Sequence, residues 1–71
     1  MNKLYGYRYK PGGMVFELPG RGLDSATADV ISRRLQQRHN GNPETVELVE
    51  QVGGGWWVVP LPGDETEAVA Q

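Results

Sequence analysis

The chain has no cysteine and only one histidine among its 71 residues. Disulfide bonds and thiolate metal ligands are therefore excluded, and a reducing compartment suits the sequence. Apolar runs are also short: none approaches the roughly 18 residues that cross a bilayer, and the first ten residues lack the apolar stretch of a secretory signal. We expect a small cytoplasmic protein without a membrane-spanning segment.

Charge is unevenly placed along the chain. The formal net charge is −2, yet all Lys and Arg residues lie within residues 1–61, whereas Asp64, Glu65 and Glu67 follow them. We predict a single domain over residues 1–61 and a flexible acidic tail over residues 62–71, which has few large apolar groups. The near-neutral domain does not favour non-specific nucleic-acid binding, which usually requires a clearly basic face.

A first hairpin is predicted from two runs of strictly alternating side chains within the first 18 residues. A two-residue turn at Gly12-Gly13 would oppose Tyr9 to Phe16 and Arg8 to Glu17. A three-residue loop would instead oppose Arg8 to Phe16 and Tyr7 to Glu17, and such a one-residue slip moves every side chain to the wrong face. The predicted inner face carries Tyr5, Tyr7, Tyr9, Met14, Phe16 and Leu18.

One amphipathic helix is predicted within residues 23–41. Asp24 suits the N-cap position, because its carboxylate can accept from the first backbone N–H groups. Gly41 suits the left-handed residue that follows a helix. At 100° per residue, the apolar stripe that should face the sheet consists of Ala28, Ile31 and Leu35.

A second hairpin is predicted around three consecutive glycines. A two-residue turn at Gly53-Gly54 opposes Leu48 to Val59, and a three-residue turn that includes Gly55 remains an alternative. Pro60 cannot donate to a ladder, so the last strand is expected at an edge of the sheet. Two hairpins around one helix predict an α+β fold, ββαββ, in which a four-stranded antiparallel sheet carries the helix on one face.

This layout resembles a family of small phage-encoded proteins. The runs KLYGYRYKPGGMVFEL, DSATADVISRRLQQRH and TVELVEQVGGGWWVV cover most of the chain. In size and layout they resemble the compact inhibitors that bacteriophages direct against host defences, anti-CRISPR proteins among them. The resemblance implies stoichiometric binding to a host protein or nucleoprotein complex, without catalysis.

The residues that carry enzyme chemistry are few. His39 lies at the expected end of the helix, where a cation complements the helix dipole. Neither Ser25 nor Ser32 has a base placed near it by the sequence. The acidic residues lack metal-ligand spacing, and the glycines before the helix lack the lysine of a phosphate-binding loop. We therefore predict a protein that is not an enzyme and that has no catalytic residue, cofactor or metal.

The adjacent tryptophans indicate a binding surface. Neighbours in a strand face opposite sides, so Trp56 must face outward if Trp57 packs beneath the helix. Tryptophan and arginine are frequent anchors of protein interfaces. The predicted surface for a protein partner consists of Trp56, Val58, Val49, Arg8 and Lys10.

Two alternatives stay open at this stage. The basic helix end formed by Arg33, Arg34 and Arg38 suits a nucleic-acid-binding protein, whose affinity would fall steeply with salt. A homodimer formed through a sheet edge or through the outer sheet face is the other alternative.

Overall fold

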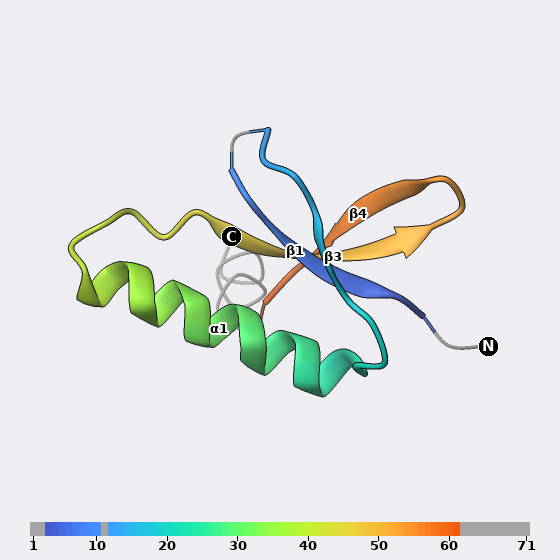
Figure 1. The fold of residues 1–71 in the computed structure, drawn as a ribbon, viewed down its shortest axis with the longest axis horizontal. Coiled ribbons are helices and arrows are strands. Elements are labelled where there is room, and N and C mark those ends of the chain that lie inside the picture. Colours follow the sequence, from blue (N-terminus) through green and yellow to red (C-terminus); the bar gives the residue numbers. More distant parts are fainter. Residues whose placement is uncertain (1–2, 11, 62–71) are drawn as a thin grey trace, which may run out of the picture.

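The computed structural model describes residues 3–10 and 12–61 of the chain. One helix lies against a four-stranded antiparallel sheet whose strand order is β2-β1-β3-β4 (Figure 1). The predicted α+β fold, ββαββ, is therefore confirmed, whereas the tail predicted over residues 62–71 lies outside the described residues. In chain order the elements are β1 (Tyr5–Tyr9), β2 (Phe16–Leu18), α1 (Leu23–His39), β3 (Val46–Val52) and β4 (Gly55–Val59).

The core lies between α1 and the two central strands, β1 and β3. Ala26 and Val30 of the helix are fully buried, as is Val46 of β3. Small side chains on the helix allow a close approach to the sheet, so the helix contributes little apolar area of its own. The rest of the buried cluster consists of Tyr5, Leu18, Leu48 and Leu61, with Tyr7, Tyr9 and Val59 packed against it.

The predicted inner face of the helix is wrong. Ala28 is exposed, and Ile31 and Leu35 have 38% and 52% of their surface exposed. The helix is rotated so that Ala26 and Val30 face the sheet, and polar side chains continue that face toward its C-terminal end. Phe16, also expected in the core, is 46% exposed, and Met14 is 76% exposed.

Both helix ends are well defined. The helix begins at Leu23 and its N-cap is Gly22, which has no side chain to cap it, so the predicted capping by Asp24 is wrong. Asp24 lies in the first turn, where a negative charge still complements the helix dipole. At the other end Gly41 has a φ of 76°, which confirms its predicted left-handed conformation.

The first hairpin has the predicted faces but a different register. Tyr7 lies opposite Phe16, where a two-residue turn would have placed Tyr9, so the strands are joined by residues 10–15. A shift by two residues preserves the face of every side chain. Gly6 permits this register, because a Cβ there would lie 2.8 Å from the carbonyl oxygen of Phe16 and 3.0 Å from Cγ1 of Val15.

The second hairpin has the predicted two-residue turn. Leu48 lies opposite Val59, and Glu50 lies opposite Trp57. Gly53 has a φ of 59°, a value that glycine adopts without strain. β4 is an edge strand, as the proline that follows it indicated.

Candidate functional site

The β3–β4 hairpin carries the most exposed tryptophan of the chain. Its turn end extends away from α1 (Figure 1). Trp57 has 62% of its surface exposed, and Val52 on the neighbouring strand, 50% exposed, lies on the same face, whereas Val58, 52% exposed, faces the other side of the sheet. We call Trp57 and Val52 the hairpin patch. Because α1 packs mainly on β1 and β3, the helix-side face of β4 at Trp57 stays open.

The predicted exposures of the two tryptophans are therefore wrong, whereas the partner-binding role of Trp56 stays a prediction. Trp57 does face the helix side of the sheet, opposite Glu50, but the helix does not extend over it. Trp56, the expected exposed anchor, is partly buried on the other face. Val49, expected beside it on an open surface, is completely buried. Val58 is the one apolar member of the predicted surface that is largely exposed.

Arg8 and Lys10, expected at the rim of the binding surface, neutralise a buried carboxylate. Glu47 has only 4% of its surface exposed and lies opposite Arg8 in the sheet. Its Oε2 accepts a hydrogen bond from Nε of Arg8, and its Oε1 lies 3.5 Å from Nζ of Lys10. Burying a carboxylate is costly unless it is paired, so both cations have a structural role. The sequence did not reveal this cluster, because the β1–β3 register was not predicted.

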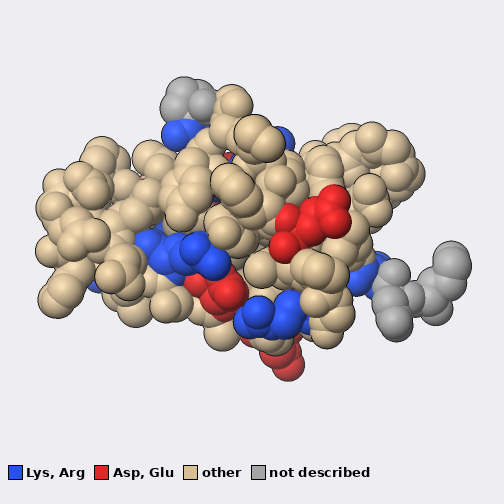
Figure 2. Space-filling model, viewed as in Figure 1, with Lys and Arg blue, Asp and Glu red and all other residues tan. Residues whose placement is uncertain are grey.

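The basic side chains at the helix end are also engaged within the chain. Arg34 Nε donates to the carbonyl oxygen of Val46 at 2.8 Å. Arg38 forms a bidentate pair with Glu44, at 2.9 Å and 3.1 Å. Through its hydrogen bonds, Arg38 lowers the pKa of the exposed Glu44 carboxyl below its ordinary value. Basic and acidic side chains accordingly lie beside one another on the face shown in Figure 2.

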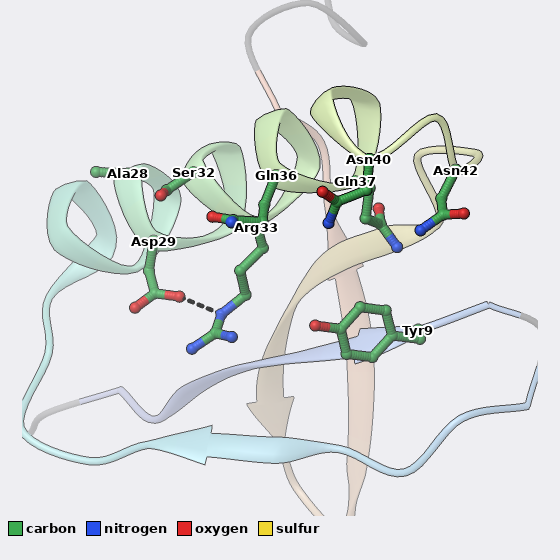
Figure 3. Close-up of a pocket in the computed structure, with 9 residues that line it drawn as sticks. All are labelled: Tyr9, Ala28, Asp29, Ser32, Arg33, Gln36, Gln37, Asn40 and Asn42. Carbon is green, nitrogen blue, oxygen red and sulfur yellow. Dashed lines mark hydrogen bonds and ion pairs between the residues drawn. The ribbon is translucent and has the colours of Figure 1, made fainter.

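A polar groove of about 700 Å³ runs between α1 and the end of β1 (Figure 3). Arg33 extends from the helix into this groove, where its Nε lies 2.5 Å from Oδ1 of Asp29. Tyr9 lines the sheet side. The amide side chains of Gln36, Gln37, Asn40 and Asn42 line the rest. The groove can offer hydrogen bonds to a polar ligand, but it places no nucleophile beside a general base.

The three predicted arginines do not form one anion site. Arg33 contacts Asp29 in the groove and lies over the ring of Tyr7. Arg34 contacts the first residue of β3, and Arg38 contacts Glu44 in the segment before that strand. A phosphate would have to compete with these partners for each guanidinium group.

The described residues do not group their possible metal ligands at one place. His39 is exposed at the end of α1. Residues 3–10 and 12–61 contain no cluster of three or more His, Asp and Glu side chains arranged to hold a metal ion. Over the same residues, no helix has the length and apolar character to cross a bilayer.

Comparisons with known proteins do not identify a functional site in this chain, so the candidate sites are defined by geometry. No family model, no curated protein and no solved structure matches the chain. The hairpin patch is thus the candidate site that its exposure and chemistry define, and the polar groove is the second.

Proposed function

We propose that the chain is a small, non-catalytic binding protein that acts stoichiometrically on a protein partner through the hairpin patch. The observation that carries the proposal is the 62% exposure of Trp57 on a hairpin that extends away from the helix. Clustered apolar side chains in water favour association, and a tryptophan among them is a typical anchor.

The chemistry of the hairpin suits a protein partner better than a nucleic acid. The residues of β4, GWWVV, carry no charge, so the strand offers apolar area and backbone hydrogen bonds. Nucleic-acid binding relies on cations available to phosphates. Arg33, Arg34 and Arg38 all contact acceptors of the chain itself.

A phage-encoded inhibitor of a host defence complex is the more specific form of this proposal. It rests on the resemblance in size and layout to anti-CRISPR proteins. The hairpin patch would then occupy an apolar depression on a subunit of that complex, and inhibition would follow from occupancy without turnover.

Affinity capture with matched variants tests the proposal. Tagged wild-type protein, Trp57→Ala and Leu35→Ala are incubated with a bacterial lysate, and retained proteins are quantified by mass spectrometry. Leu35 is the control, because it is 52% exposed but lies on α1. We expect one set of proteins to be retained by the wild type and by Leu35→Ala and lost with Trp57→Ala.

Titration of the purified partner completes the test. An anchor tryptophan typically contributes about 2 kcal/mol, so Trp57→Ala should weaken binding roughly thirtyfold. Calorimetry should give a fixed stoichiometry and no turnover. Equal retention by all three proteins, each with an unchanged circular dichroism spectrum, would contradict the proposal.

A further inference from the structure

The outer edge of β4 presents backbone groups as well as side chains. Gln51 N donates to the carbonyl oxygen of Leu4 at 2.9 Å, so odd-numbered β3 amides face β1 and even-numbered ones face β4. Hydrogen-bonding direction alternates along an antiparallel ladder. The N–H and C=O groups of Trp57 therefore point toward β3, and those of Trp56 and Val58 point away from it. No described strand lies beyond β4 to receive them.

We propose that the β4 edge that carries the hairpin patch also binds a second copy of this chain, whose β4 pairs antiparallel with β4 of the first. Trp57 of one copy lies opposite Trp57 of the other, on a two-fold axis perpendicular to the sheet. Both helices then lie on the same side of a continuous sheet. This inference rests on the proposed function, because the second copy covers the same surface and must dissociate before another protein can occupy it.

The positions of the turn and of Pro60 select this register. With Trp57 on the axis, Trp56 of each copy pairs with Val58 of the other, and all four outward N–H groups find acceptors. A shift of two residues in one direction would place Pro60, which has no N–H, opposite Trp56. The opposite shift would place Gly54, a turn residue, opposite Val58. Both shifted registers lose hydrogen bonds.

The same register brings the two tryptophans together. Pairs that do not share hydrogen bonds approach most closely in an antiparallel ladder, and aromatic pairs are favourable there. Trp57 would therefore cover its counterpart on the helix-side face. On the opposite face Val58 would lie beside Trp56 of the second copy.

The lack of charged side chains on β4 permits two copies of the strand to pair. Because β4 carries no charged side chain, a two-fold axis brings no like charges together within the new strand pair. Glu50, the acidic neighbour of Trp57 on β3, is paired with Lys3 at 2.9 Å. Isologous pairing also closes the assembly, because each copy uses its β4 edge once. The opposite edge, β2, has only 3 residues and offers little to a further copy.

The area involved predicts a weak dimer. A tryptophan side chain buries about 150–250 Å² when fully covered, so Trp57 and Val58 together offer on the order of 300 Å² for each copy. The resulting total of roughly 600 Å² lies below the about 1,200 Å² of stable complexes. We expect a dissociation constant in the high micromolar range or above, and detection therefore requires concentrated protein or a covalent trap.

Single-cysteine variants of this cysteine-free chain supply the trap. In the proposed register, residues 57 of the two copies have Cα atoms about 4.5 Å apart, within reach of a disulfide, whereas residues 58 are offset beyond it. Trp57→Cys should form a homodisulfide about tenfold or more faster than Val58→Cys or Leu35→Cys in a mild thiol–disulfide buffer. Equal rates together with monomeric wild type would overturn the dimer, and faster trapping of Val58→Cys would overturn its register.

A second variant tests the dimer while Trp57 stays in place. Val58→Pro removes an outward N–H and spares the β3 ladder. By sedimentation at about 1 mM protein, wild type should self-associate and the proline variant should remain a folded monomer. Monomeric wild type without preferential trapping would overturn the inference, whereas Trp57-dependent capture of another protein would still support the proposed function. If Trp57→Ala also leaves capture unchanged, both proposals fail.

Discussion

The guanidinium carbon of Arg33 lies 3.8 Å from the centroid of the Tyr7 ring. The same guanidinium group is paired with Asp29, and the Tyr7 ring stacks on Phe16 with a centroid separation of 5.2 Å. A charged side chain of α1 thus covers the part of the sheet where an apolar residue was expected. The contact explains how a helix with two fully buried residues, Ala26 and Val30, holds its position on the sheet.

Replacing Arg33 should destabilise the fold more than replacing an exposed arginine. We expect Arg33→Ala to lower the free energy of unfolding by about 1–2 kcal/mol, because a cation–π contact and an ion pair within the helix are both lost. Arg33→Lys should lose about half as much, since it keeps the charge but not the planar stack. Arg38→Ala, whose side chain is 66% exposed, should leave stability nearly unchanged.

Urea denaturation followed by circular dichroism measures all three variants. An Arg33→Ala midpoint equal to that of the wild type would show that the Tyr7 contact contributes nothing to stability.

The helix face illustrates what the sequence could not determine. Hydrophobic periodicity assigned the inner face to Ala28, Ile31 and Leu35, because these apolar residues recur at helical spacing and two of them are large. That method assumes that burial follows hydrophobicity. Here the aliphatic and polar parts of Arg33 and Gln37 lie over tyrosines and a strand end, and Gln37 Oε1 accepts from Thr45 N at 2.9 Å. Such contacts depend on tertiary structure and leave no periodic signal.

Truncating Val30 should reduce stability more than truncating Leu35. The helix face predicted from the sequence implies the reverse order. Val30 is fully buried, so Val30→Ala should cost about 2 kcal/mol through lost transfer free energy and a residual cavity. Leu35 is half exposed, so Leu35→Ala should change stability by about 0.5 kcal/mol or less. Denaturation midpoints of the two variants decide the matter, and a larger loss for Leu35→Ala would refute this helix orientation.

Gly6 should be one of the glycines that the sheet requires. A Cβ at this position would meet the backbone of Phe16 at 2.8 Å, and backbone atoms of a paired strand cannot move aside cheaply. We expect Gly6→Ala to cost about 1–3 kcal/mol. Gly54→Ala is the control, since a Cβ there would meet nothing within 4 Å. Thermal unfolding should show a clear drop for Gly6→Ala alone, and equal melting temperatures would contradict the β1–β2 register.

Strand pairing was predictable where turn chemistry dictated it. The second hairpin followed from two consecutive turn glycines, and its register was confirmed. The first hairpin kept its faces, but its register moved by two residues: residues 10–15 join the strands, and the N–H of Gly13 donates to Tyr9 O at 2.9 Å. The exposure of Trp57 was not predictable from parity, because parity gives the face of a residue and not the reach of the helix.

The Arg38–Glu44 pair should give a measurable pH dependence. Arg38 holds the pKa of the Glu44 carboxyl below its ordinary value, chiefly through a hydrogen bond. A carboxyl with a lowered folded-state pKa stabilises the fold above its unfolded pKa, and this contribution is lost as the pH falls through the lowered value. Arg38→Ala should therefore raise the titration midpoint of Glu44 in NMR spectra. Lys3→Ala, which removes a pair with Glu50, should leave that midpoint unchanged.

The two tryptophans should differ in fluorescence and in their contribution to stability. Trp57 is largely in water, whereas Trp56 is partly buried on the opposite face. In dilute Trp56→Phe protein, where Trp57 is the remaining emitter, emission should lie at longer wavelength and iodide should quench it more strongly than in Trp57→Phe. Trp56→Ala should cost about 1–3 kcal/mol, because it uncovers sheet that includes the buried Val49, and Trp57→Ala about 0.5 kcal/mol or less. The reverse order in both measurements would mean that Trp57 is the tryptophan that packs against the domain, and the hairpin patch would then lose its anchor.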